Sequence, residues 1–254
     1  MKKTILLLLI LAISISGCKK DDENIDESDG NVNGMYIKTI KQGNDVLLRF
    51  SYDANHRLIK TNIYYNGSEL ETTYTYTGNN LTGEIAKSGN TLVHQYTYQY
   101  DNSGNLSRCD LTVPSGQAYW LYDYDNNDRI TQSTQYINGH PGIKKVYTYT
   151  GNNLTEAVEY YRFGSVWEMQ HRVEMDYDNK NNPEAVHNLP FSEVMDEFAN
   201  FVSPNNQTHV IEYNSDGSIE SEISYSYTYN AQGYPSVVEQ TEGGSTITLN
   251  IYYE

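Results

Sequence analysis

Cysteine and positive charge are what this sequence has least of. Its 254 residues include 2 Cys, too few for a disulfide framework, a zinc ribbon or a thiolate cluster. Lys and Arg number 17 against 33 Asp and Glu, which gives a net charge of −16. Nucleic acids and anionic lipid surfaces both require a basic partner, so we expect no nucleic-acid binding and no charge-driven adsorption to membranes.

Long apolar runs are also scarce, and the clearest one lies at the N-terminus. Lys2 and Lys3 precede the apolar stretch 4–13, which is too short to span a bilayer. The following Ile15-Ser16-Gly17-Cys18 resembles the bacterial lipobox. We therefore expect a lipoprotein signal peptide over 1–17, with Cys18 acylated as the first mature residue. A plain signal peptide with an incidental cysteine is the alternative.

The segment after Cys18 is polar and acidic. Residues 18–34 offer almost nothing to bury, so they predict a lipidated, flexible tether, and the folded domain is expected over 35–254. Lys19-Lys20-Asp21-Asp22-Glu23 resembles the export tag of surface-exposed Bacteroidetes lipoproteins. This resemblance implies an outer-membrane protein at the cell surface, attached by its lipid anchor alone. A solvated charge run within a tether is the alternative.

Internal repetition dominates the rest of the chain, which contains 25 Tyr. A tyrosine, a polar turn and then an aliphatic residue or proline recur at intervals of about 24 residues, and the nonapeptide YTYTGNNLT occurs at both 74–82 and 147–155. The repeat tyrosines, here called anchors, are expected at Tyr52, Tyr76, Tyr100, Tyr124, Tyr149, Tyr177, Tyr213 and Tyr229.

Apolar and polar residues alternate before each anchor, which is the period-2 pattern of a strand with one buried face. After the anchor, Asp or Asn can close an Asx-turn, and Gly or Asn can take the position with positive φ. Each repeat therefore predicts a β-hairpin. The chain predicts an all-β antiparallel meander of about 14–16 short strands, strongly curved or closed into a barrel.

The motif Tyr-Asp-x-x-Gly-x-Leu, as in Tyr100 to Leu106, resembles the YD repeats of Rhs-type and teneurin shells. The mature chain also resembles an uncharacterised family of Bacteroides lipoproteins with a porin-like fold. These resemblances imply a curved or closed antiparallel sheet and no particular activity. Proline replaces the aliphatic residue at Pro183 and Pro235, which predicts frayed or edge strands there.

One segment interrupts the repeat. Residues 192–202 predict a short amphipathic helix that begins at Ser192 and ends before Pro204, with Phe198 and Phe201 on its apolar face. We expect it to plug the concave face or cover an open edge, and a partner-binding helix is the alternative. A membrane-spanning barrel is disfavoured, because the apolar positions are more often Tyr than Leu or Val and a lipid anchor would be superfluous.

Catalytic and metal-binding signatures are lacking. The histidines form no metal-binding spacing, so no metal site and no cofactor are predicted; they are His56, His94, His140, His171, His187 and His209. The acidic run 123–128 resembles a calcium loop but lacks the required Gly and terminal Glu. We expect no enzyme, although a pair of carboxylates could hydrolyse a glycoside if the fold brought them together.

The aromatic residues give the remaining functional indication. Trp120, Tyr122 and Tyr124 share one strand face, and Trp167 lies near Tyr160 in another repeat. Such rings stack on sugars or anchor protein partners, although a Tyr-rich core explains them equally well. We therefore expect a non-enzymatic surface module that binds a glycan through exposed aromatic residues. A structural or protein-interaction module that docks an outer-membrane partner is the alternative.

Overall fold

The computed structural model describes residues 36–185 and 195–254. The predicted signal peptide 1–17 and tether 18–34, with Cys18, lie outside the described residues, as do the first residues of the predicted helix.

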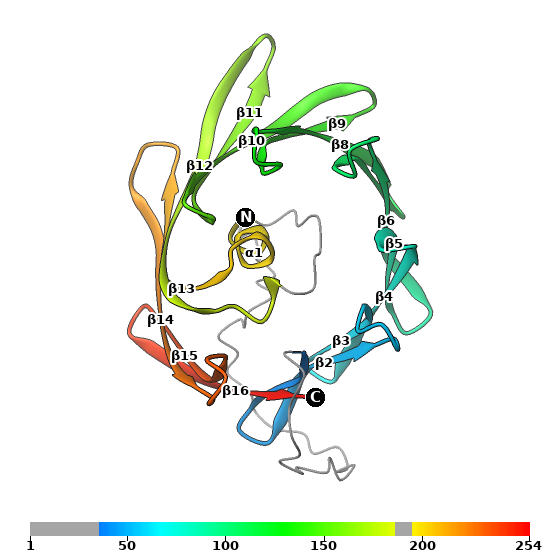
Figure 1. Ribbon diagram of the computed structural model, residues 1–254. Helices are drawn as coiled ribbons and strands as arrows, with labels where there is room; N and C mark the ends of the chain where they lie inside the picture. Colours follow the sequence, from blue (N-terminus) through cyan, green and yellow to red (C-terminus); the bar gives the residue numbers. More distant parts are fainter. Residues whose placement is uncertain (1–35, 186–194) are drawn as a thin grey trace.

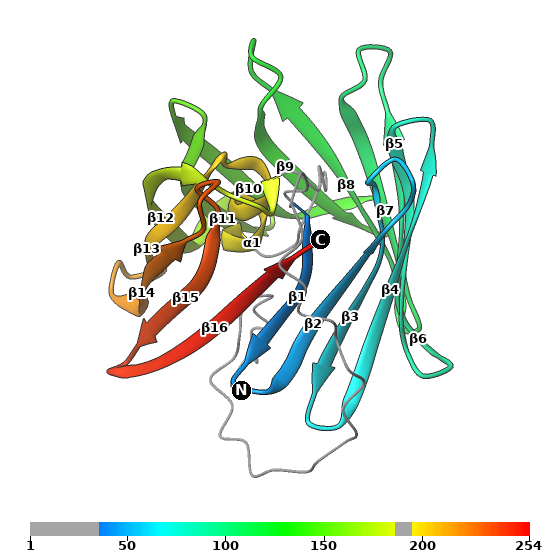
Figure 2. The same ribbon diagram turned by 60° about the horizontal axis from the view of Figure 1, so that its bottom comes forward.

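Sixteen antiparallel strands form one closed barrel, which confirms the predicted meander and decides between the two forms that the sequence left open, a curved sheet and a closed one. Figures 1 and 2 show the ring from two directions. Each strand pairs with its neighbours in the chain, and β1 pairs with β16 to close the ring. The strands are β1 (Ile37–Gln42), β2 (Asp45–Tyr52), β3 (Leu58–Tyr65), β4 (Ser68–Thr77), β5 (Asn80–Ser88), β6 (Thr91–Tyr100), β7 (Leu106–Val113), β8 (Gly116–Tyr124), β9 (Ile130–Ile137), β10 (His140–Thr150), β11 (Asn153–Phe163), β12 (Val166–Asn181), β13 (Asn205–Asn214), β14 (Ile219–Tyr229), β15 (Pro235–Glu242) and β16 (Ser245–Tyr253).

The two ends of the barrel differ. We call the end with the β2–β3, β6–β7, β8–β9 and β14–β15 turns the anchor end, and the opposite end, with the β1–β2 and β11–β12 turns, the far end. The first described residue and the C-terminus both lie at the anchor end, where the Glu254 N–H donates to the Tyr36 carbonyl. The chain therefore enters the barrel at residue 36 from the anchor end.

The anchor tyrosines tie each hairpin to the one before it. The Tyr76 hydroxyl donates to the Leu58 carbonyl at 2.9 Å, and the Tyr100 hydroxyl donates to Leu81 at 2.8 Å. The same bond recurs for Tyr52, Tyr124, Tyr149 and Tyr177. A β-bulge lies directly before each of these tyrosines, for example between Gln99 and Tyr100, where it re-aims the side chain. The repeat thus encodes bonds between hairpins as well as the strands themselves.

Two anchor assignments from the sequence are corrected. The Tyr229 hydroxyl donates to the Asp178 carboxylate instead of a backbone carbonyl. Tyr213 follows the interruption, so its turn falls at the far end, and its hydroxyl donates to Glu174 instead of a backbone carbonyl. Tyr253, at the end of β16, makes the anchor bond that Tyr213 lacks: its hydroxyl donates to the Pro235 carbonyl at 2.6 Å. Pro235 is fully buried at the start of β15, so the predicted frayed or edge strand at this proline is wrong. β12, which ends two residues before Pro183, and β15, which begins at Pro235, each pair with a strand on both sides, so neither is an edge strand.

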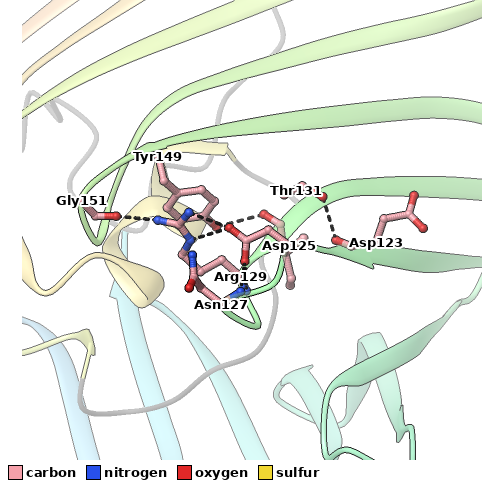
Figure 3. A network of polar contacts seen from close by, with 8 residues as sticks. Asp123, Asp125, Asn127, Arg129, Thr131, Tyr149 and Gly151 are labelled. Atoms are coloured by element: carbon pink, nitrogen blue, oxygen red, sulfur yellow. Dashed lines mark hydrogen bonds and ion pairs between the residues drawn. The ribbon is translucent and has the colours of Figure 1, made fainter.

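The turns after the anchors are Asx-turns, as predicted. Asp125 accepts the backbone N–H groups of Asn127 and Arg129, and its carboxylate pairs with the Arg129 guanidinium at 2.6 Å (Figure 3). The Arg129 guanidinium also donates to the Gly151 carbonyl and lies over the Tyr149 ring. Asp53 and Arg57 repeat this arrangement against the next hairpin. These arginine bonds hold the pKa of both aspartates below their usual value.

In two of the turns, positive φ falls on a residue type other than the expected Gly or Asn. Gly104 takes this conformation as predicted, but His56 and Asp128 hold the equivalent position in their turns, each with φ of 58°. The Asx-turn hydrogen bonds therefore stabilise a conformation that costs a non-glycine residue roughly 1 kcal/mol or more.

The inner wall carries three separate apolar clusters, because a barrel of about sixteen strands is too wide for side chains to fill. Two of them centre on Trp120 and Leu249. The third includes Ala199 of the single described helix, α1 (Met195–Val202), which lies inside the ring in Figure 1 and confirms the predicted helix. No described helix is long and apolar enough to cross a membrane.

Polar bonds fasten α1 to the wall formed by β11, β12 and β13. Ser203 is fully buried, and its hydroxyl accepts from the Leu154 N–H and donates to the Tyr177 hydroxyl, both at 3.1 Å. The Asn182 side-chain amide donates to the carbonyls of Asn200 and Ser203. Within the described residues, α1 therefore acts as a plug against the inner wall, as the sequence predicted.

Replacing Tyr100 with phenylalanine is expected to lower the free energy of unfolding by about 1 kcal/mol, the usual value of one hydrogen bond to a buried acceptor. Burial raises the Tyr100 pKa to about 12, consistent with a hydroxyl held in its neutral form. Tyr65→Phe is the matched control, because this tyrosine is exposed at the end of β3 and lies outside the anchor series. Urea unfolding of both variants checks this, and equal losses would contradict the role of the anchors.

Candidate binding surface

The two tryptophans lie on opposite faces of the barrel wall. Trp120 of β8 is only 3% exposed and packs on the inner face with Cys109 and Tyr98. Tyr122 packs between two of the inner clusters, and Tyr124 is an anchor whose hydroxyl donates to the Leu106 carbonyl. These three residues share one face, as predicted, but the expectation that they form an exposed aromatic surface is wrong.

Trp167 and Tyr160, by contrast, come together on the outer wall. Trp167 of β12 pairs in register with Arg162 of β11, and Tyr160 lies two residues before Arg162 on the same face. Tyr160 also pairs with Lys144 of β10, whose neighbour Lys145 is buried on the inner side. The outer position of Lys144 follows from this alternation.

Lys144 joins the two aromatic rings. Its Nζ lies 4.8 Å from the Tyr160 ring centre and 5.1 Å from the Trp167 ring centre. The Arg162 guanidinium lies 6.0 Å from the same tryptophan ring and donates to the Gly164 carbonyl. Within the described residues, neither cation forms an ion pair with a carboxylate. We call Lys144, Tyr160, Arg162 and Trp167 the cationic aromatic platform.

More rings continue this surface over the neighbouring strands. Tyr119 of β8 and Tyr136 of β9 stack with ring centres 4.9 Å apart and planes only 2° from parallel. Tyr136 lies two residues from Thr134, the β9 partner of Lys144, so it is a diagonal neighbour of the platform. On the other side of this pair, the Arg108 guanidinium lies 3.8 Å from the Tyr119 ring centre.

Arg108 differs electrostatically from the platform cations. Its guanidinium is bonded to the Asp110 carboxylate, and this bond raises the Arg108 pKa. The charge at this site is therefore already balanced, whereas Lys144 and Arg162 leave the platform positive on a chain with a net charge of −16. A hollow of about 550 Å³ further around the wall has the opposite character, since Glu156, Glu174 and Asp176 line it.

The acidic run 123–128 does not assemble a calcium loop. Asp123 accepts from Gln132, Asp125 pairs with Arg129, and Asp128 accepts from the Asn105 side chain. In Figure 3 the Asp125 carboxylate meets Arg129, whereas the Asp123 carboxylate points away from both residues. The three carboxylates are therefore used in the turn and the wall.

Sequence reasoning missed Tyr119, Tyr136, Lys144 and Arg162. Strand alternation places Tyr119 on the opposite face from Trp120, so the outward position of Tyr119 could have been predicted from the sequence. The association of Lys144 with Trp167 depends on the register of three strands, which a bulge between Glu159 and Tyr160 alters. Sequence spacing does not reveal such a bulge.

The fold defines a class of protein, the closed antiparallel barrel of sixteen strands. Among solved structures, a porin-like protein from Bacteroides uniformis ATCC 8492 is similar over 82% of this chain and 89% of its own, with a TM-score of 0.53 and 14% identity. A porin-like protein from Bacteroides vulgatus ATCC 8482 matches over 86% and 98%, with a TM-score of 0.43 and 12% identity. No protein-family model and no curated protein matches the chain.

Proposed function

We propose that the chain is a non-enzymatic binding module, held at the outer-membrane surface by a lipid on Cys18, that binds a glycan on its cationic aromatic platform. The observation that carries this proposal is the position of Lys144 between Tyr160 and Trp167 on the outer wall. Rigid rings with polar edges stack on sugar rings, and neighbouring cations attract carboxylate or sulfate substituents. The preferred ligand is therefore an acidic polysaccharide.

The topology supports presentation of this surface away from the membrane. A tether that ends before Tyr36 joins the anchor end, whereas the β11–β12 turn beside Trp167 lies at the far end. Ion pairs such as Lys60–Glu71 and Arg172–Glu174 lie on the outer wall. A charge facing lipid near the midplane costs about 2–4 kcal/mol for Arg or Lys, so we place the barrel outside the bilayer.

The proposal predicts that the chain binds a sulfated polysaccharide more tightly than a neutral one, and that salt weakens this binding. The chain, extracted in detergent as the cell produces it, is titrated with dextran and dextran sulfate while tryptophan fluorescence is followed. Trp167→Ala and Lys144→Gln should each weaken binding of dextran sulfate at least about tenfold, equivalent to roughly 1.4 kcal/mol.

Lys41→Gln is the matched control, because Lys41 also lies over a tyrosine ring, that of Tyr252, but far from the platform. It removes the same charge and should leave the affinity almost unchanged. Equal weakening by Lys41→Gln would show nonspecific attraction to the chain, and no binding by the folded wild-type chain would contradict the proposal.

One observation favours the alternative of a protein partner. Phe163, Val166, Ile137 and Ile219, all near hairpin tips at the far end, are each about half exposed or more. Exposed apolar side chains gathered at one rim suit a protein contact. Helix α1 suits it less, because Ala199 and Val202 pack against the inner wall. Recovery of an outer-membrane protein with the wild-type chain, lost in Phe163→Ser, would support this alternative.

A further inference from the structure

Three potential metal ligands meet on three adjacent strands of the inner wall, away from the platform. His171 lies on β12, Glu212 on β13 and Glu220 on β14. Glu212 is 5% exposed and lies opposite Val173, a member of an inner-wall cluster. Glu220 is the extra residue of a bulge, because Glu212 pairs with Ser221 and Tyr213 pairs with Ile219. This bulge re-aims the Glu220 side chain toward the other two.

The geometry leaves a space between the three groups. The His171 Nε2 atom lies 4.0 Å from a Glu212 carboxylate oxygen and 3.6 Å from one of Glu220, and all three ligand atoms lie within 4.8 Å of one another. The Nε2 atom is buried and has no hydrogen-bond partner. These separations are too long for direct hydrogen bonds, which require about 2.7–3.2 Å.

The same separations suit a metal ion. Imidazole nitrogens and carboxylate oxygens are both Zn²⁺ ligands, and bonds of about 2.0–2.2 Å place neighbouring ligands roughly 3.4 Å apart in a tetrahedron. Movements of a few tenths of an ångström bring the Nε2 atom to that spacing from its present 3.6 and 4.0 Å. The two carboxylate oxygens, which lie within 4.8 Å of each other, approach further by rotation of the half-exposed Glu220 side chain. The Ser221 hydroxyl donates to the Glu212 carboxylate at 2.9 Å and orients it, as outer-shell groups do in metal sites.

The charges of the two glutamates also favour a bound cation. Within the described residues, no Lys or Arg forms an ion pair with Glu212 or Glu220, and the nearby Lys145 pairs with Glu159. Two carboxylates, one of them buried, therefore share a single imidazole. A divalent cation would balance both charges and use the unpartnered nitrogen.

We propose that His171, Glu212 and Glu220 form a divalent-metal site on the inner wall, with Zn²⁺ as the fitting ion and a fourth coordination position left to water. The site is independent of the proposed glycan-binding platform, which lies on the outer wall. The competing explanation is an ion pair of protonated His171 with the two glutamates, which needs no metal.

The test is calorimetric titration of Zn²⁺ into the detergent-extracted chain after it has been stripped with a chelator. We expect one equivalent to bind with a micromolar or tighter Kd, and His171→Ala and Glu220→Gln each to weaken it at least about tenfold. Glu220 is half exposed, so its variant should fold even if changes at buried Glu212 do not. Zn²⁺ should also raise the unfolding temperature of the wild-type chain but not of His171→Ala.

His209 provides the matched control. It lies on the outer wall, 2.9 Å from Glu222 and 3.7 Å from Asp176, so it offers the same ligand types at the surface. His209→Ala should leave the tight equivalent intact. The proposal is overturned if the wild-type chain binds no Zn²⁺, if His171→Ala binds it equally well, or if His209→Ala removes the binding.

Discussion

Replacing Trp120 with alanine is expected to lower the free energy of unfolding by about 3–5 kcal/mol, the range for a buried large aromatic side chain. The indole is 3% exposed and is packed within the inner cluster that also holds Leu81, Leu106 and Cys109. Its loss leaves a cavity that strands fixed on both sides cannot close. Chemical denaturation followed by circular dichroism measures the change.

Trp167→Ala is the natural comparison, because it removes the same side chain from the outer wall. We expect it to cost less than about 1 kcal/mol, since exposed cation–π contacts contribute about that much or less. Equal destabilisation by the two substitutions would show that the tryptophans do not differ as the structure places them.

Replacing Ala199 with glutamate is expected to detach α1 from the inner wall and lower the free energy of unfolding by about 2–4 kcal/mol. Ala199 is fully buried among Leu154, Val173 and Val210, where a carboxylate cannot be solvated. The Leu154 N–H donates to the Ser203 hydroxyl just after α1, so its hydrogen exchange should accelerate at least about tenfold.

Asn200→Glu adds the same charge one residue further along α1, where the side chain is partly exposed. This variant should keep slow exchange at Leu154. If both variants behave alike, α1 is not seated through Ala199, and the plug described above is incorrect.

Much of the architecture could be predicted because one physical unit repeats. Alternation around each anchor defines strand faces, and an aspartate or asparagine after it closes a turn. YTYTGNNLT at 74–82 and 147–155 forms the same bulged hairpin in both places. The sequence did not decide between a curved sheet and a closed ring, because closure depends on the pairing of β1 with β16, at opposite ends of the chain.

The error at Tyr213 has a physical cause. Its turn, which contains Gly217 at φ of 82°, has the same hydrogen bonds as the anchor turns, so the local sequence is correct for a hairpin. The segment that contains α1 takes the place of one anchor-end turn, and β13 then runs toward the far end. A local motif specifies a turn but not the end of the barrel to which the chain has returned.

The functional surfaces were harder to find because they depend on register. His171 and Glu220 are 49 residues apart, beyond any local metal motif, and a bulge brings them together. Trp120 and Trp167 look equivalent in the sequence, since neither is required by the repeat. Only the pairing of their strands shows that one faces inward and the other outward.

Collisional quenching of the two tryptophans tests the central claim, that the ligand surface is the outer wall around Trp167 and not the inner wall around Trp120. The variants Trp120→Phe and Trp167→Phe each leave one indole, and acrylamide quenching is measured with and without dextran sulfate. We predict that Trp167 is quenched readily and is protected by the polysaccharide, whereas Trp120 is shielded throughout and does not respond. A polysaccharide-dependent change at Trp120, with none at Trp167, would contradict the account.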